Sequence, residues 1–357
     1  MNRLSWQVRG ESALRAPKGT DRGHGRVRPV GKTRILQWIA AMLGGVAVLL
    51  ASHPVLGQDF PTRSIRMIVP FPPGAGTDVL AREVGAQLTK IWGQSVVVEN
   101  RAGAGGTIGS EAAAKAPRDG YTVLMGNVST LAIAPALYPN LPYDPLKAFD
   151  TVALTGSNVN SLLVHVSLPV KTLAEFVAYA KANPGKLLYS SAGSGTTSHL
   201  AAEYFRLATN IDIRHVPYKG SPQATTDLLG GQVHLSFAAV NTTVTVMSSG
   251  KVRVLATTGL TRSPVLPDVP TIDELGYKGF ETNVWQGFVV PAGTPKPIIA
   301  KLNQGINQAA ESADVRKHME ALGSTVRTST PEEFTSYLKA EIAKWGDLVK
   351  RTGAKAD

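Results

Sequence analysis

Cysteine is absent from the chain of 357 residues. Without cysteine there is no disulfide, no thiolate ligand for zinc or an iron-sulfur cluster, no thiol nucleophile and no cysteine to carry a lipid. Charged residues are also sparse at 18%, whereas hydrophobic residues make up 43%. This composition excludes a disordered, collagen-like or coiled-coil protein and indicates a globular chain with room for about two domains.

The net charge of +11 is concentrated at the N-terminus. Residues 1–57 hold nine Lys or Arg against two acidic residues, a balance of +7, and the other 300 residues carry only +4. A nucleic-acid partner is therefore not indicated by the globular part of the chain.

The N-terminal segment has the pattern of an export signal. A cationic stretch precedes the apolar run ILQWIAAMLGGVAVLLA at 35–51, and Val55-Leu56-Gly57 follows it. We predict a cleaved signal peptide over residues 1–57, a mature chain that begins near Gln58, and a periplasmic location. An uncleaved membrane anchor is the alternative, although seventeen residues are at the lower limit for a hydrocarbon core of about 30 Å.

From Ser64 onward, β-rich runs alternate with amphipathic helical patterns, which predicts an α/β fold with helices on both faces of parallel sheets. Two series of strands are expected, and a last strand at 285–290 returns to the first series. The expected strands are 65–69, 96–98, 121–125 and 151–154, then 161–166, 187–190, 213–217, 235–240 and 252–257. The final helix should bury Phe334, Leu338, Ile342, Trp345 and Val349.

The two series share a motif where a strand and a glycine-rich turn lead into a helix. The first helix begins TDVLARE at 77–83, and 120 residues later the second begins TSHLAAE at 197–203. Thr, Leu, Ala and Glu coincide at four of the seven positions. We interpret this match as a repeated functional unit, with chance agreement as the alternative.

Glycine-rich turns of this kind have a defined chemistry. The first N–H groups of a helix have no partner within the helix, and the helix dipole adds partial positive charge there, so the turn binds anions. A merely structural turn is the alternative for either loop alone. Two such turns with hydroxyl side chains predict a cleft that grips a small carboxylate from both sides.

Signals for catalysis, nucleotides and metals are weak. The loop NRAGAGGTIGS has isoleucine at position 108, where G-x-G-x-x-G would continue, and Ala192 stands where a G-x-S-x-G elbow around Ser194 needs glycine. The histidines show no i, i+4 pair. We therefore expect no catalytic residue, no metal and no cofactor.

Three residues near these motifs have two interpretations each. Asp78 either caps its own helix, which we prefer, or meets an ammonium group. His199 either donates to a carboxylate or packs beneath its loop. Trp285 either walls a pocket or packs at a hinge.

Six segments resemble the Bug-type extracytoplasmic solute receptors of tripartite tricarboxylate transporters. They are VPFPPGAGTDVLAR, VVVENRAGAGGTIG, DGYTVLMGN, SSAGSGTTSHLAAEYF, HVPYKGSPQATTDLLGGQV and SPVLPDVPTIDELG, and they occur in the family's order. The resemblance covers residues 60–350. It implies a type II periplasmic binding protein, a Venus flytrap of two doubly wound α/β domains joined by crossing strands. With the strand order, it places domain I at 58–157 and 285–357 and domain II at 158–284.

The resemblance also implies the ligand, the partner and the site. A small mono- or dicarboxylate would be held by the two glycine-rich loops, partly through water, and passed to permease subunits in the membrane by a monomeric receptor. The residues that the family pattern supplies are Gly74, Ala75, Gly76, Thr77, Asn127, Ser129, Ser194, Gly195, Thr196, Thr197 and Ser198. We add Asp78, His199, Phe237, Asn241 and Trp285 to the expected site.

One position departs from the family pattern. After GGQV the family commonly has an aspartate, and here the residue is Ala238. If that aspartate orients the far end of the ligand, a ligand with an ammonium group is disfavoured in this chain. Asn241 is the nearest polar substitute.

Three functions follow from these patterns. The first is a periplasmic carboxylate receptor, the second an exported hydrolase or isomerase acting on a small acidic substrate, and the third a scavenger or sensor partner without a permease. A ligand that raises the melting temperature and is recovered unchanged would distinguish a receptor from an enzyme.

The export signal gives a first testable prediction. The secreted chain should begin near Gln58, as N-terminal sequencing of the periplasmic fraction would show. Recovery of the full-length chain in carbonate-washed membranes would contradict cleavage.

Overall fold

The computed structural model describes residues 60–356. The expected signal peptide at 1–57 lies outside the described residues. Between residues 60 and 356, no helix has the length and apolarity needed to cross a membrane.

Strands and helices alternate along most of the described chain. The strands are β1 (Ile65–Val69), β2 (Val96–Asn100), β3 (Thr122–Asn127), β4 (Phe149–His165), β5 (Leu187–Ser191), β6 (Ile213–Pro217), β7 (Leu235–Ala239), β8 (Val252–Thr257), β9 (Asn283–Pro291) and β10 (Thr325–Val326). The helices are α2 (Gly76–Trp92), α3 (Thr107–Ala114), α4 (Ala134–Leu137), α5 (Pro145–Ala148), α6 (Leu173–Ala182), α7 (Thr197–Thr209), α8 (Ser221–Leu229), α9 (Val240–Val246), α10 (Lys296–Ala310), α11 (Ala313–Ala321) and α12 (Pro331–Thr352). Three short helical turns are η1 (Ala104–Gly106), the π-turn η2 (Ser129–Ile133) and η3 (Met247–Ser249).

The strand order is β2-β1-β3-β9-β4-β7-β5-β6, with β8 and β10 also paired to β4. Strands β1, β2 and β3 are parallel to one another, and so are β5, β6 and β7. Strand β9 is antiparallel to β3 and β4, and β4 is antiparallel to β7 and β8. Two parallel sets are therefore joined through β9 and β4, as expected for an α/β chain with crossing strands.

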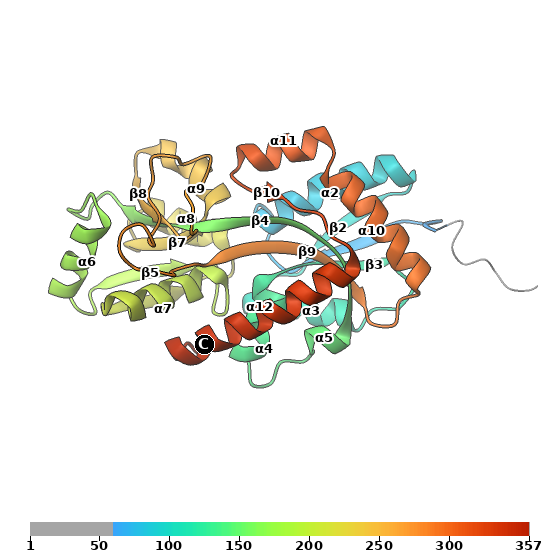
Figure 1. Cartoon of the computed structure of the whole chain (residues 1–357), viewed down its shortest axis with the longest axis horizontal. Coiled ribbons are helices and arrows are strands. Elements are labelled where there is room, and N and C mark those ends of the chain that lie inside the picture. Colours follow the sequence, from blue (N-terminus) through green and yellow to red (C-terminus); the bar gives the residue numbers. More distant parts are fainter. Residues whose placement is uncertain (1–59, 357) are drawn as a thin grey trace, which may run out of the picture. The chain divides into compact units, whose positions relative to one another are not determined.

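Strand β4 corrects one expectation. We expected separate strands at 151–154 and 161–166, but one strand of 17 residues covers both. The polar segment 155–160 between them resembles a turn in sequence, yet it stays extended because β9 pairs with it through Asn158 and Val159. Figure 1 shows β4 in green and β9 in orange lying side by side.

Helices cover both faces of each parallel set because its strands are apolar at successive positions. Met67 packs with the α2 and α10 side chains Leu80 and Leu302, whereas its neighbour Ile68 packs on the other face with Phe334 of α12. In the second set, Phe237 of β7 packs in the core that holds Phe176 of α6 and Phe205 of α7, while Leu188 of β5 packs against another cluster that contains Leu228 of α8. Burial on both faces explains the continuous apolar runs in the sequence. The expected domain boundaries stay a prediction.

The last helix also differs in one detail. Its capping box forms as its sequence indicates, with Thr330 and Glu333 each bonding the other's backbone N–H. However, the buried stripe includes Glu341, and the neighbouring Ile342 is only partly buried. Glu341 faces the core because its Oε2 accepts hydrogen bonds from the indoles of Trp285 (2.7 Å) and Trp345 (3.0 Å).

Candidate functional site

The first loop of the site connects β1 to α2. Gly74 takes a positive φ of 80°, and Ala75 occupies the N-cap position with extended backbone and no side-chain cap. The first N–H groups of α2 therefore lack the usual side-chain acceptor. The Thr77 hydroxyl oxygen accepts a bond from Asn127 Nδ2 (3.4 Å), so its proton is left for another acceptor.

The second loop connects β5 to α7 and is organised by its own hydroxyls. Thr196 Oγ1 donates to the carbonyl of Gly193 (2.6 Å), and Ser198 Oγ accepts from the N–H of Ala192 (3.0 Å). The two hydroxyls also bond to each other at 2.9 Å. Helix α7, like α2, has no side-chain N-cap bond. Thr196 and Ser198 thus shape the loop, and no side chain at the N-cap position accepts from the first N–H groups of α7.

A third helix, α8, begins close to the first loop. Its N-cap residue is Gly220, and α8 also lacks a side-chain cap. A Cβ on Gly220 would lie 2.3 Å from Cγ of Pro72, so only glycine permits this approach. Similarly, a Cβ on Gly76 would lie 2.4 Å from Nδ2 of Asn241 on α9. These approaches bring the start of α8 and the start of α9 against the first loop.

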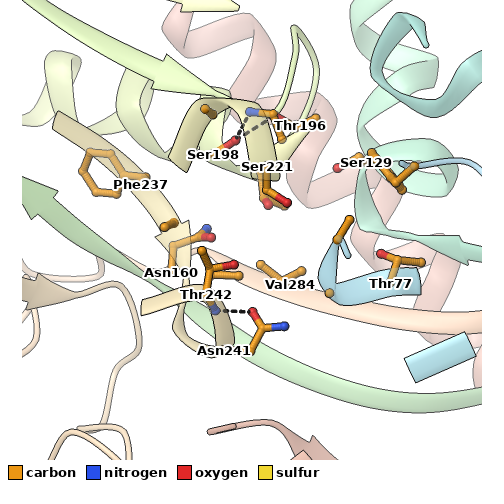
Figure 2. A pocket seen from close by; sticks show the side chains of 18 of the residues that line it. Thr77, Ser129, Asn160, Thr196, Ser198, Ser221, Phe237, Asn241, Thr242 and Val284 are labelled. Carbon is orange, nitrogen blue, oxygen red and sulfur yellow. Dashed lines mark hydrogen bonds between the residues drawn. The ribbon is translucent and has the colours of Figure 1, made fainter. Parts of the chain in front are cut away.

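A pocket with a cavity volume of about 90 Å³ lies where these helices begin. It is lined by Phe71, Ala75, Gly76, Thr77, Asn127, Ser129, Asn160, Ala192, Thr196, Thr197, Ser198, Ser221, Ala224, Thr225, Ser236, Phe237, Ala238, Ala239, Asn241, Thr242, Val284 and Gln286. Figure 2 shows Thr77 and Ser129 on one side of it and Asn160 and Thr242 on the other. The volume is well below the ~300 Å³ at which drug-sized ligand sites begin. The pocket suits a small solute.

None of these lining residues carries a charge. Positive potential comes instead from the starts of α2, α7 and α8, each of which acts as roughly half a positive charge. Hydroxyl and amide side chains surround these ends. The arrangement can hold an anion through backbone N–H and neutral donors.

Most residues expected in the site line this pocket. They are Ala75, Gly76, Thr77, Asn127, Ser129, Thr196, Thr197, Ser198, Phe237 and Asn241. Phe237 has no exposed surface, and its ring packs at 5.5 Å from that of Phe205 in the hydrophobic core. It therefore contributes little surface to a ligand.

The remaining expected residues lie outside the pocket lining, and three of them support the second loop. The carbonyl of Ser194 accepts a bond from the Tyr138 hydroxyl (2.9 Å), and Gly195 takes a positive φ of 80° where a Cβ would meet Leu137 at 2.7 Å. The N–H of Gly195 donates to Nδ1 of His199 (3.2 Å), whose ring stacks on His215 at 4.2 Å. His199 thus packs beneath its loop, the second of its two interpretations.

Gly74 and Asp78 form a separate cluster beside the pocket. The Asp78 carboxylate is 2% exposed and accepts bonds from Gly74 N–H (2.9 Å), Asn100 Nδ2 (2.8 Å) and Arg82 Nε (3.0 Å). Burial alone would raise the pKa of Asp78, but the bonds from Arg82, Asn100 and Gly74 together hold its pKa below the ordinary value. Asp78 therefore stabilises the first loop through its bond to Gly74, and its negative charge is already balanced by Arg82.

Trp285 does not wall the pocket. The side chain is fully buried and donates to Glu341, and its ring packs edge-on against Phe334 and Tyr337. Its neighbours Val284 and Gln286 line the pocket instead, because successive side chains of β9 point to opposite faces. The lining positions of β9 are therefore the two residues on either side of the predicted Trp285.

Several lining residues were missed from the sequence. Ser221 was detectable, because Ser-Pro after a strand is a helix start. Asn160 and Gln286 had no such signal, since they lie inside strands rather than after a glycine-rich turn. The described residues contain no group of three His, Asp or Glu positioned to hold a metal ion.

Comparisons with known proteins identify the family and the fold of the chain. The model of the tripartite tricarboxylate transporter family receptor matches residues 80–354. BugT of Bordetella pertussis is 39% identical over 324 residues, which span 90% of this chain and 98% of that protein. The solved periplasmic binding protein BugD is 36% identical with a TM-score of 0.80, and an R. palustris protein solved with adipate is 35% identical with a TM-score of 0.81. Each structural match covers 84% of this chain and 100% of the other.

The Asp78 cluster gives a stability prediction. Asp78→Asn should lower the free energy of unfolding by about 1–3 kcal/mol at pH 7, because buried donors lose a charged acceptor. The folded-state pKa is depressed, so this stabilisation is complete above the unfolded value of about 3.9 and is lost as the pH falls through the folded pKa. Urea unfolding at pH 7 and at a series of acidic pH values measures it.

Glu320→Gln is the control for Asp78→Asn. Glu320 lies 3.8 Å from Arg316 in an exposed pair, so its loss should change stability by less than about 0.5 kcal/mol. An Asp78→Asn protein as stable as the unmodified chain at pH 7 would contradict the bracing role.

Proposed function

This chain belongs to the tripartite tricarboxylate transporter family of receptors, and from that premise we propose that it captures a small carboxylate in the pocket and delivers it to the permease subunits of such a transporter. The family resemblance carried by the six sequence motifs is confirmed. The chain has the fold of the periplasmic binding proteins.

The convergence of three uncapped helix starts on a pocket lined by uncharged residues is the observation that supports a carboxylate ligand. A hydrogen bond to a charged group contributes about 1.5–3 kcal/mol. A few such bonds to one carboxylate can supply most of the roughly 8.2 kcal/mol of a micromolar complex after the cost of closure. The adipate bound in the R. palustris relative is consistent with this ligand class.

The same pocket gives no support to the exported hydrolase or isomerase. Two of its hydroxyls, those of Thr196 and Ser198, bond to each other and to their own loop rather than to a base. A nucleophile needs an adjacent base or a lowered pKa. The relatives are receptors, and binding without conversion is the function that the geometry favours.

The location and assembly belong to the same proposal. We expect export through the N-terminal signal, cleavage near Gln58, and action as a monomer in the periplasm. The periplasmic relatives support this location.

The proposed hydrogen bonds to the carboxylate are tested by replacing threonine with valine, which removes a hydroxyl group and keeps the shape of the side chain. Calorimetric titration with acetate, propionate, butyrate, succinate, glutarate and adipate should identify a carboxylate that binds and is recovered unchanged. Thr77→Val and Thr197→Val should each weaken its binding by about tenfold, the value of one charge-assisted bond.

Thr107→Val is the matched control, because Thr107 is also a buried threonine at a helix start but does not line the pocket. Its affinity for the carboxylate should be unchanged. If no acid in the panel binds, the proposed function is wrong; if one binds with equal affinity to both pocket variants, the two threonines do not hold it.

A further inference from the structure

A third glycine-rich turn connects β2 to α3 and does not line the ligand pocket. It belongs to the motif NRAGAGGTIGS, and Ala104, Gly105 and Gly106 follow one another with φ values of 46°, 61° and 97°. Backbone bonds hold this turn, from the N–H of Gly106 to the carbonyl of Gly103 (2.9 Å) and from the N–H of Thr107 to the carbonyl of Ala104. A positive φ is uncommon for a residue with a Cβ such as Ala104, so the shape of the turn calls for a role.

The turn contacts the second loop of the site, which belongs to the other parallel set. The turn follows β2, whereas the second loop follows β5. A Cβ on Gly105 would lie 2.5 Å from the carbonyl oxygen of Ser194, and a Cβ on Gly193 would lie 3.9 Å from Cα of Gly105. The two loops therefore meet through their backbones, and a side chain at position 105 would push them apart.

Tyr138 adds a hydrogen bond to this contact. It follows α4, which belongs to the same side as the turn because it lies between β3 and β4 along the chain. The Tyr138 hydroxyl donates to the carbonyl of Ser194 (2.9 Å), and it would lie 2.8 Å from a Cβ on Gly105. Ser194 is only 9% exposed, so its carbonyl would lose this donor with little water to replace it.

The contact borders the ligand pocket. A second cavity of about 240 Å³ lies between the turn and the second loop, and it shares Phe71 and Ala192 with the ligand pocket. Ser194 precedes Thr197, the first residue of α7, by three positions. A displacement of Ser194 is therefore passed directly to the helix start that is proposed to hold the carboxylate.

Resting on the proposed function, we propose that Tyr138 and Gly105 are positioning residues, which form a latch between the two parallel sets and hold the second loop around the bound carboxylate. Neither residue lines the ligand pocket. The ligand enters while the sets are apart, and the latch forms when they approach each other. The latch therefore stabilises only the arrangement that holds the ligand, and its loss weakens binding although no contact to the ligand is removed.

Dissociation kinetics test the hydrogen bond of the latch. The probe is the acid of the series from acetate to adipate that binds most tightly in calorimetry. Tyr138→Phe should raise its koff about three- to tenfold, the equivalent of one neutral hydrogen bond, and should change kon by less than about twofold, because the latch forms after the ligand has entered.

Tyr121→Phe is the control for Tyr138→Phe. The Tyr121 hydroxyl also bonds to the backbone, accepting from the N–H of Thr62 (3.0 Å), but both residues belong to the side of β1 and β3 and neither lines the ligand pocket. This variant should leave koff and kon unchanged.

A glycine pair tests the close approach of the loops. Gly105→Ala should weaken binding at least tenfold, because its Cβ would collide with the carbonyl of Ser194. Gly93→Ala is the control, since Gly93 has a similar φ of 65° and no atom lies within 4 Å of its Cβ. Both variants strain the backbone, so a loss of affinity confined to Gly105→Ala reports the contact between the loops.

Each failure has a distinct meaning. Unchanged koff in Tyr138→Phe, or equal losses of affinity in Gly105→Ala and Gly93→Ala, would overturn the latch while leaving the carboxylate receptor intact. A lower kon with unchanged koff in Tyr138→Phe would also overturn it, because the contact would then act before the ligand enters. If no carboxylate binds at all, the proposed function fails, and this inference fails with it.

Discussion

The site depends on one constraint, which is that the first N–H groups of a helix have no partner inside it. Three strands, β1, β5 and β6, each end shortly before a helix that lacks a side-chain cap. Because these helix starts face one small pocket, they supply its positive potential without a lysine or arginine in the lining. Glycine at position 220 additionally lets the start of α8 approach the first loop, because a Cβ there would lie 2.3 Å from Cγ of Pro72.

The strands β4 and β9 form the other part of the pocket and link it to the rest of the fold. Side chains of β9 alternate between the two faces, so Val284 and Gln286 line the pocket while Trp285 donates to Glu341 of α12. The buried Glu341 holds two indoles at once and fixes the last helix against this strand. The strands that join the two parallel sets thus also contribute Asn160 and Gln286 to the pocket lining.

Much of the fold and about half of the site follow from local sequence rules. The paired motifs at Thr77 and Thr197 were recognisable because a glycine-rich turn before a helix has a fixed composition. Strand β4 was divided wrongly because the polar segment 155–160 stays extended only through pairing with β9, which is distant in sequence. The sequence does not identify Asn160 and Gln286 as pocket residues, because only neighbours that are distant in sequence place an amide side chain of a strand in a pocket. His199 and Asp78 lie in the two paired motifs, but they accept hydrogen bonds from the backbone of their loops and do not line the pocket.

In the proposed complex, backbone N–H groups at the starts of α2, α7 and α8 hold the carboxylate. Amide ¹H–¹⁵N spectra of the mature chain, recorded while adding the carboxylate that binds most tightly in calorimetry, test this most directly. We expect the largest shifts to fall on the amides that begin α2, α7 and α8, including Thr77, Thr197 and Ser221. Saturation of binding with these amides unshifted, and with shifts confined to another part of the surface, would contradict it.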